Sequence, residues 1–186
     1  MSFSGIILAG GRSSRMGEDK ALLQIDGKPM IQHVSDVLRE LCDEVIIASS
    51  NEKHAQYGDL MVKDSAKDIG PLAGIQAGLL AAKNERSFVL SCDTPFVTKE
   101  ILEALAEHFE GEQITLPSSQ GRLQPLIAIY GKEVLTTIAS NLERNEHSLM
   151  QLQKICSAKV IHFDESESKA FENINTPSEW KQWNEK

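Results

Sequence analysis

The chain has 186 residues, enough for one domain with a sizeable hydrophobic core and short for two, so we expect a single domain over residues 1–186. Its formal net charge of −8 at pH 7 argues against a general nucleic-acid binder, which needs a basic face. The chain also has no basic leader, no apolar run of membrane length, and 3 cysteines without CxxC spacing. A cytoplasmic protein with no membrane or nucleic-acid partner is therefore the expectation.

A glycine-rich basic loop follows the first predicted strand. The apolar run at residues 5–9 predicts a buried strand, and after it come Gly10, Gly11, Arg12, Arg15 and Lys20. Glycines let a backbone approach an anion closely, and arginine and lysine then neutralise the charge. This arrangement predicts a phosphate-binding loop in preference to a set of solvated surface charges. Neither the P-loop pattern nor the GxGxxG dinucleotide pattern is present in it.

Strands and helices alternate along the rest of the chain. We expect further strands at residues 44–48, 60–62, 87–91, 113–116, 126–130 and 159–163. We expect helices at residues 29–41, 71–83, 98–109, 132–142, 148–156 and from 177 onward, and polar loops at 117–124 and 164–169. Alternation of this kind predicts an α/β fold, a three-layer α/β/α sandwich around a mostly parallel, Rossmann-like sheet.

Acidic side chains follow two of the predicted strands directly. Asp64 follows the strand at 60–62, and Asp93 follows the strand at 87–91. The carboxyl ends of parallel strands share one edge of a sheet, so both carboxylates are expected beside the basic loop. Asp93 could hold Mg²⁺, which prefers hard oxygen ligands, or it could cap the turn that follows it. The residue types alone leave both interpretations open.

Four short motifs resemble one known family. The pattern LAGGxSxRMGxDKAL, which begins at Leu8, resembles the signature loop of nucleotidyltransferases, which bind a nucleoside triphosphate and expel pyrophosphate. Within that superfamily the loop resembles the molybdenum cofactor guanylyltransferases. CDTP at residues 92–95, GPLAG at 70–74 and NINTP at 173–177 resemble further motifs of the same family.

The resemblance implies a reaction and its substrates. The enzyme would transfer GMP from GTP to the terminal phosphate of molybdenum-molybdopterin, releasing pyrophosphate and forming the molybdopterin guanine dinucleotide cofactor. It would use Mg²⁺, and other cofactor-biosynthesis or acceptor proteins are further candidate partners. Three residues would carry the chemistry: Asp93 as the metal ligand, Lys20 at the triphosphate, and Arg15 at the departing pyrophosphate.

The same resemblance implies the residues that bind the substrates. Main-chain groups would line the nucleoside and the phosphates, from Leu8, Ala9, Gly10 and Gly11. Asp64 would contact the guanine nucleotide. Asn173 and Asn175 would face the second substrate or the metal site, although asparagines before a capped helix also form turns. Arg122 and Gln124 match a loop near the pterin, and one unspecified residue of 48–51 would meet the nucleotide.

Other functions remain as alternatives. A molybdopterin cytidylyltransferase usually reads LAAG where this chain has Gly11, so the second glycine favours guanine. A nucleotidyltransferase acting on cobinamide phosphate or a sugar phosphate is a further possibility, as is a non-catalytic module that binds nucleotide or delivers the cofactor. A zinc site is not expected, because the 5 histidines lack ligand spacing. We interpret Cys92 as a packed residue, and Gly74 and Gly78 as points of close helix packing.

Overall fold

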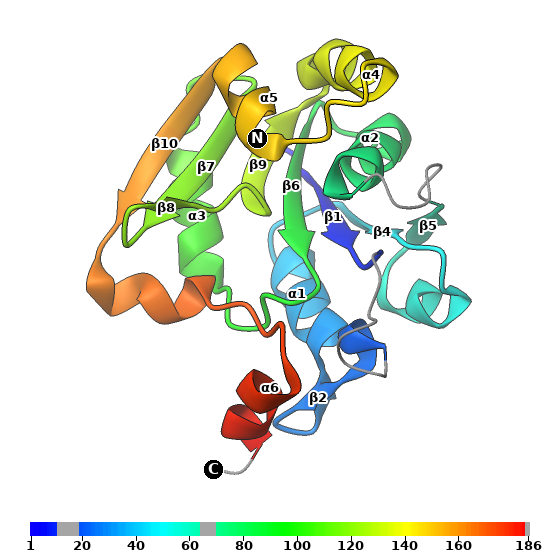
Figure 1. Ribbon diagram of the computed structural model, residues 1–186, viewed down its shortest axis with the longest axis vertical. Helices are drawn as coiled ribbons and strands as arrows, with labels where there is room; N and C mark the ends of the chain where they lie inside the picture. The colour runs from blue at the N-terminus through cyan, green and yellow to red at the C-terminus, as the bar shows by residue number, and fades with distance from the viewer. Residues whose placement is uncertain (11–18, 64–69, 185–186) are drawn as a thin grey trace.

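The computed structural model describes residues 1–10, 19–63 and 70–184 and is built on an 8-stranded sheet (Figure 1). The strand order is β10-β7-β9-β6-β1-β4-β5, and β8 pairs with β7. The strands are β1 (Ser4–Leu8), β4 (Glu44–Ala48), β5 (Leu60–Val62), β6 (Arg86–Ser91), β7 (Ile114–Ser119), β8 (Arg122–Leu123), β9 (Ile127–Gly131) and β10 (Ala158–Phe163).

The sheet is mostly parallel, as predicted. Strands β6, β1, β4 and β5 run in one direction, whereas β9 runs antiparallel to both of its neighbours, β6 and β7. The register pairs Leu8 with Ala48 on one side and with Ser91 on the other. The carboxyl ends of β1, β4 and β6 therefore finish level with one another, and the segments that follow them begin at one edge.

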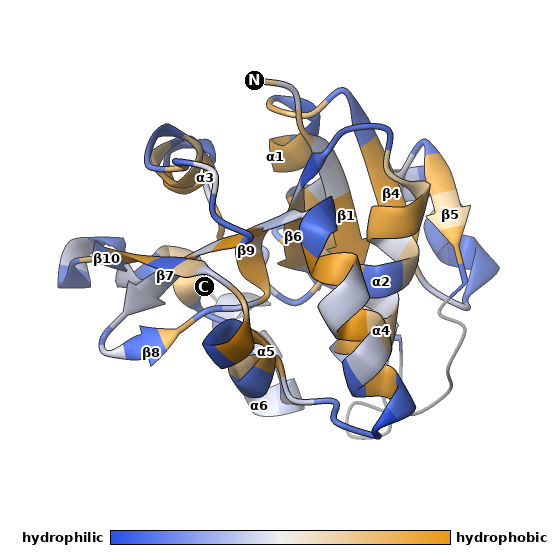
Figure 2. Ribbon diagram, turned by 90° about the horizontal axis from the view of Figure 1, so that it is seen from above, coloured by the Kyte–Doolittle hydropathy of each residue, from blue (hydrophilic) through white to orange (hydrophobic). Residues whose placement is uncertain are grey.

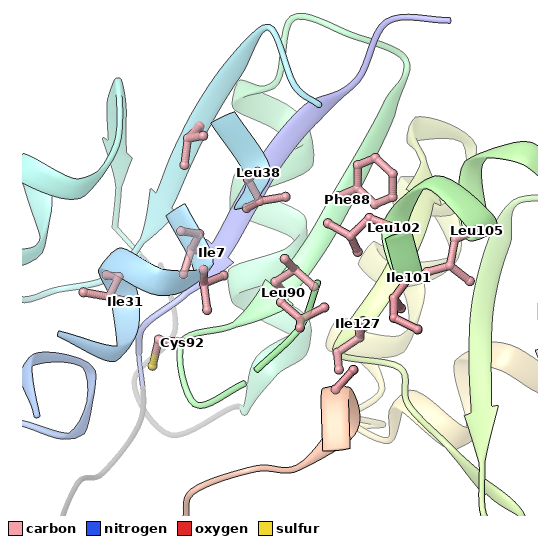
Figure 3. Packing of buried hydrophobic residues seen from close by; sticks show 14 of the residues in the cluster. Ile7, Ile31, Leu38, Phe88, Leu90, Cys92, Ile101, Leu102, Leu105 and Ile127 are labelled. Atoms are coloured by element: carbon pink, nitrogen blue, oxygen red, sulfur yellow. The ribbon is translucent and has the colours of Figure 1, made fainter. Parts of the chain in front are cut away.

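Helices cover both faces of the sheet and complete the predicted three layers (Figure 2). One face carries α1 (Met30–Arg39) and α3 (Lys99–Glu107), and the other carries α2 (Pro71–Ala81), α4 (Leu135–Glu143) and α5 (Leu149–Ile155). Successive side chains of β1 point to opposite faces, so Ile7 packs under α1 and Ile6 under α2. Figure 3 shows the first of these cores, where Leu38 and Leu102 meet Phe88.

Helix α2 packs very closely on the central strand. A Cβ atom on Gly78 would lie 2.6 Å from Cγ2 of Ile6, which is too close for any side chain without a shift. The interpretation of Gly78 as a packing glycine is therefore confirmed. Gly70, which precedes α2, has a φ angle of 80° and open space around its Cα, so its conformation itself favours glycine.

The C-terminal helix α6 (Pro177–Asn184) packs on a small hairpin outside the main sheet. The hairpin consists of β2 (Gln24–Ile25) and β3 (Lys28–Pro29), and a third apolar cluster joins Ile25, Met30 and Ile174 to Trp180 and Trp183. Nε1 of Trp180 donates a hydrogen bond to the carbonyl oxygen of Gln24 at 2.8 Å. These contacts hold the segment before α6 against the early part of the chain.

Several predicted bounds differ from those of the structure. The predicted loop at 117–124 is partly a hairpin, because β7 continues to Ser119 and turns back into β8 through Gln120 and Gly121, both with positive φ. The predicted solvated loop at 164–169 is largely a 3-10 helix, η5 (Glu165–Phe171), which Asp164 caps and buried Phe171 anchors. Helix α1 begins at Met30, since Pro29 lies in β3 and serves as the N-cap. Short polar segments lack the apolar periodicity that would reveal such elements.

Candidate active site

An ion pair lies at the carboxyl edge of the sheet, where β1 and β6 end. Lys20 is the first residue of the 3-10 helix η2 (Lys20–Leu22), and its Nζ lies 2.5 Å from Oδ2 of Asp93. Both side chains are only 16% exposed. Opposite charges attract more strongly in such a poorly hydrated place than in open water. Two of the residues predicted to carry the chemistry are thus in direct contact.

The segment before α6 adds a third predicted residue to this pair. Nζ of Lys20 also donates to Oδ1 of Asn175 at 2.7 Å. The neighbouring residue, Ile174, is buried in the third apolar cluster, and its backbone N–H donates to the carbonyl oxygen of Asp93 at 3.0 Å. Asn173 is exposed on the same segment. The C-terminal segment is therefore fastened to the loop after β6 and presents Asn175 to Lys20.

One carboxylate oxygen of Asp93 has the character of a metal ligand. Its Oδ1 is buried and has no hydrogen-bond partner among the described residues, which is a costly state for an acceptor. The following turn is closed without this oxygen, by hydrogen bonds from Thr94 N and Oγ1 to the carbonyl oxygen of Ser91. The described residues contain no cluster of three acidic, histidine or cysteine side chains. One carboxylate together with substrate phosphates is a usual Mg²⁺ environment, so the donor set fits that ion.

The main chain at the end of β1 is partly engaged by the sheet. The carbonyl oxygen of Leu8 accepts from Cys92 N at 3.0 Å, and Ala9 N donates to the carbonyl oxygen of Ala48 at 3.0 Å. Gly10 lies exposed immediately past these hydrogen bonds. Of the three described residues expected to line a nucleoside, Gly10 therefore has the most accessible backbone.

A polar cavity of about 460 Å³ adjoins the ion pair through Asn175. One wall comes from the β7–β8 hairpin, a second from η5, and a third from the segment before α6. Its lining residues include Ser119, Gln120, Arg122, Gln124, Ser168, Asn173 and Asn175. Of these residues, Arg122 and Gln124 were expected near the pterin from the sequence. The residues of the hairpin turn and of η5 were not expected, because both segments lack a periodic pattern and were predicted to be loops.

The residues after β4 have roles that the sequence left open. The Oδ1 atom of Asn51 caps the 3-10 helix η3 (Glu52–Tyr57), and its Nδ2 donates to Oδ2 of Asp19. Ser49 is buried, and its Oγ contacts Nδ1 of His54. Both side chains are thus committed to protein partners, while Ser50 is exposed. Asp19 was noted only as part of the family motif that begins at Leu8, and His54 was given no role, since nothing in their spacing links residues 19 and 54.

Cys92 is a packed residue, as interpreted from the sequence. It lies buried in the apolar cluster beneath α1, and burial together with the neighbouring Asp93 carboxylate raises the pKa of its thiol to about 12. A thiol with so high a pKa carries almost no thiolate at neutral pH and is a poor nucleophile. Three further predicted site residues, Gly11, Arg15 and Asp64, lie outside the described residues.

Residues 5–159 match the family of MobA-like NTP transferase domains, and this match covers most of the chain. The chain belongs to this family. A relative from Pelotomaculum thermopropionicum, named "Probable molybdenum cofactor guanylyltransferase", is 35% identical over 182 residues, which cover 95% of this chain and 89% of that one. The molybdenum cofactor guanylyltransferase of Vibrio parahaemolyticus is 32% identical over 185 residues, which cover 97% of this chain and 94% of that one.

Solved structures support the same fold for this MobA-like transferase. The molybdopterin-guanine dinucleotide biosynthesis protein A of Archaeoglobus fulgidus superposes with a TM-score of 0.79 at 23% identity, covering 98% of this chain and 97% of that one. The MobA-like chain is therefore a nucleotidyltransferase with a Rossmann-like sheet, and enzymes of this kind generally use a divalent metal. No helix in the described parts is long and apolar enough to cross a membrane.

Proposed function

We propose that this protein transfers GMP from GTP to the terminal phosphate of molybdenum-molybdopterin, releasing pyrophosphate and forming the molybdopterin guanine dinucleotide cofactor. The observation that carries the proposal is the contact of Lys20 with Asp93 and Asn175 beside a polar cavity. Two relatives of nearly the same extent, one from Pelotomaculum and one from Vibrio, bear the name of this activity.

This reaction requires that the acceptor phosphate and GTP be held in line and that the negative charge of the phosphates be neutralised. An oxygen of the acceptor phosphate attacks the α-phosphorus of GTP, the bond from that phosphorus to the bridging oxygen breaks, and pyrophosphate leaves with the electron pair. The attacking oxygen is already anionic, so no strong general base is needed. In-line alignment and fixed positive charge therefore account for most of the required catalysis.

Lys20 and Asp93 have different electrostatic roles. The ammonium group of Lys20 lies at the carboxyl edge, where it neutralises the triphosphate and then the pyrophosphate that forms from it. Asp93 would hold Mg²⁺ through the oxygen that has no protein partner among the described residues. When bound, the ion neutralises phosphate charge and orients the phosphates for displacement. Asn175 accepts a further hydrogen bond from the lysine ammonium and helps to hold it in place.

The acceptor occupies the polar cavity. A volume of about 460 Å³ is within the range of small-molecule sites. The guanidinium of Arg122 suits a phosphate, while the amides of Gln124 and Asn173 suit the polar edges of a pterin. Since Asn175 belongs both to the cavity and to the Lys20 contacts, an acceptor bound here would direct its phosphate toward the triphosphate.

The nucleotide side of the proposal also uses residues inferred from the family resemblance. Backbone N–H groups of Gly10 and Gly11 and the side chain of Arg15 stabilise the departing pyrophosphate. Leu8 and Ala9 border the nucleoside, and Asp64 contacts the guanine nucleotide. A second glycine in the LAGG motif, at Gly11, favours guanine over cytosine.

Pyrophosphate release tests the proposal directly. The purified protein is incubated with Mg²⁺, molybdenum-molybdopterin and one of GTP, CTP, ATP or UTP. We expect release with GTP and no release after removal of the metal with a chelator. Thermal unfolding adds an acceptor-free readout, because a ligand at 100 times its Kd stabilises the native state by ~2.7 kcal/mol. A response to CTP alone would instead establish the cytidylyltransferase, and binding without pyrophosphate release would indicate a delivery module.

A further inference from the structure

A buried imidazole connects the end of β4 to the residue that precedes Lys20. His54, in η3, is 1% exposed, and its ring lies between two polar side chains. Nε2 lies 3.0 Å from Oδ2 of Asp19, and Nδ1 lies 2.7 Å from Oγ of Ser49. A carboxylate only accepts hydrogen bonds, so Nε2 carries the proton, and in the neutral ring Nδ1 accepts from the Ser49 hydroxyl.

Asp19 is held through both of its carboxylate oxygens. Its Oδ1 accepts from the backbone N–H of Ala21 at 3.1 Å and caps η2. Its Oδ2 accepts from Nδ2 of Asn51 at 2.5 Å and from Nε2 of His54. Since Lys20 is the first residue of η2, any displacement of the Asp19 carboxylate moves the backbone from which the lysine side chain extends.

Ser49 fastens the other end of the network to the sheet. Its backbone N–H donates to the carbonyl oxygen of Val62 at 3.0 Å, and its Oγ accepts from Asn51 N at 3.1 Å. The same Oγ lies 3.4 Å from the carbonyl oxygen of Ala9. The network therefore contacts Ala9, which precedes the glycine-rich basic loop of the sequence, and Asp19, which directly precedes Lys20.

The order serine, histidine, aspartate also occurs in hydrolases, but the surroundings oppose a nucleophilic role here. Ser49 is 1% exposed, and its Oγ already accepts a backbone hydrogen bond from Asn51. A nucleophile must reach a substrate carbonyl or phosphorus, which this hydroxyl cannot do. The network is therefore suited to holding neighbouring groups in place.

We propose that His54 is a positioning residue for nucleotide binding. It fixes the Asp19 carboxylate, Asp19 fixes the first turn of η2, and that turn sets where Nζ of Lys20 lies relative to Asp93 and Asn175. The inference rests on the proposed function in one respect, namely that Lys20 binds a triphosphate. It adds a residue that touches no substrate yet determines affinity for one.

Two substitutions at His54 separate positioning from bulk packing. His54→Leu retains much of the buried volume and removes both hydrogen bonds, whereas His54→Gln retains a donor that can reach Asp19. The probes are GTP with Mg²⁺ and inorganic tripolyphosphate, measured by equilibrium binding and by steady-state kinetics. We expect His54→Leu to weaken both ligands by ~10–100-fold, because small misplacements of a charged group have effects of that size. His54→Gln should recover part of the loss, and KM for the acceptor should stay unchanged.

Two controls exclude a general loss of stability. Gln56→Ala changes an amide side chain on the same 3-10 helix and should bind GTP normally. Among the described residues, this side chain hydrogen-bonds within that helix, to the carbonyl oxygen of Lys53. Ile138→Ala lowers stability from the opposite face of the sheet, and it should reduce the folded fraction without altering the Kd for GTP. A merely structural role for His54 would reproduce the behaviour of Ile138→Ala.

A double-mutant cycle tests the route through Asp19. If His54 acts through that carboxylate, His54→Leu should have little further effect on GTP binding in an Asp19→Ala background. Full additivity of the two losses would overturn the proposal. An unchanged Kd for GTP in His54→Leu would overturn it as well. If His54→Leu does not fold, Asp19→Asn takes its place, and an unchanged Kd for GTP in that variant has the same meaning.

Hydrogen exchange of the ligand-free protein keeps this test separate from that of the proposed function. Loss of the network should speed amide exchange in the peptide covering residues 19–23 and leave α3 unaffected. If the wild-type protein binds no nucleotide, the proposed function fails, while faster exchange in His54→Leu still supports the role of His54 in holding the first turn of η2. Unchanged exchange in that peptide would overturn it.

Discussion

Nζ of Lys20 lies 2.5 Å from Oδ2 of Asp93, although the two residues are 73 positions apart in the chain. The contact exists because β1 and β6 are parallel neighbours in register, Leu8 opposite Ser91, so the segments after them start side by side. A cation for phosphates and a carboxylate for a metal thus meet at one edge of the sheet. Five predictions rest on this site and on the packing that supports it.

Replacing Asp93 should abolish turnover without unfolding the protein. Asp93→Ala is expected to lower the rate of pyrophosphate release by at least ~100-fold, the usual loss when one preorganised electrostatic group is removed. The control is Asp36→Ala, which removes an exposed carboxylate of α1 that forms an ion pair with Lys28 of β3. Near-normal turnover of Asp93→Ala at saturating Mg²⁺ would remove this residue from the metal site.

Replacing Lys20 should act mainly on triphosphate affinity. Hydrogen bonds to charged groups contribute about 1.5–3 kcal/mol, so Lys20→Ala should weaken GTP binding by roughly 10–100-fold. Lys28→Ala is the matched control. Nζ of Lys28 lies 2.7 Å from Oδ2 of Asp36, a similar geometry, but the two side chains are 45% and 42% exposed. Isothermal titration with GTP and Mg²⁺ measures both. An unchanged affinity in Lys20→Ala would exclude the lysine from the nucleotide site.

The carboxylate of Glu179 should both cap helix α6 and hold the backbone of Asn175 in place. Its Oε2 accepts from the N–H groups of Asn175 at 2.6 Å and Thr176 at 2.9 Å, and Oγ1 of Thr176 accepts from Glu179 N, so Thr176 and Glu179 form a capping box. Glu179→Ala should cost about 1 kcal/mol, as measured by denaturant unfolding, and should raise KM for the nucleotide or the acceptor. Lys181→Ala, a neighbouring exposed change on α6, should alter neither quantity.

The same carboxylate predicts a pH dependence with a definite sign. The backbone N–H of Asn175 lowers the pKa of Glu179 below its usual 4.5, so the folded state favours the ionised form. Its contribution to stability is complete above about 4.5 and is lost as the pH falls through the lower folded pKa. Comparing unfolding of the wild-type protein and Glu179→Ala between neutral and acidic pH isolates this contribution. An identical pH profile in both proteins would contradict the assignment.

Gly78 should tolerate no side chain. Gly78→Ala places a Cβ 2.6 Å from Cγ2 of Ile6, a fully buried β-branched residue that has little room to move. The expected destabilisation is ~1–3 kcal/mol, typical of overpacking, and it is partly offset by alanine's higher helix propensity. Leu80→Ala on the same helix removes a side chain that is 67% exposed and should change stability by less than ~0.5 kcal/mol. A Gly78→Ala protein as stable as wild type would show that α2 can move away from β1.

Most of the fold could be predicted from local patterns. Apolar runs such as Glu44–Ala48, and apolar residues at helical spacing such as those of α1, indicate which side chains are buried. The strands, the main helices and the three layers therefore follow from the sequence. The hairpin at 117–124 and the 3-10 helix η5 could not be predicted. Both are short polar segments stabilised by sheet pairing and by the burial of single residues such as Phe171, which leave no periodic signal.

The sequence alone indicated which residues could serve nucleotidyl transfer, because the motifs around Lys20, Asp93 and Asn175 resemble those of a known family. Only the tertiary structure decided how they meet, with one lysine between a carboxylate and an amide 155 positions away. It alone also decided that His54 and Asp19 belong together and that Asn51 is committed to Asp19. The physical reason is that hydrogen bonds of this kind depend on strand register and helix docking, which bring distant residues together without leaving any pattern along the chain.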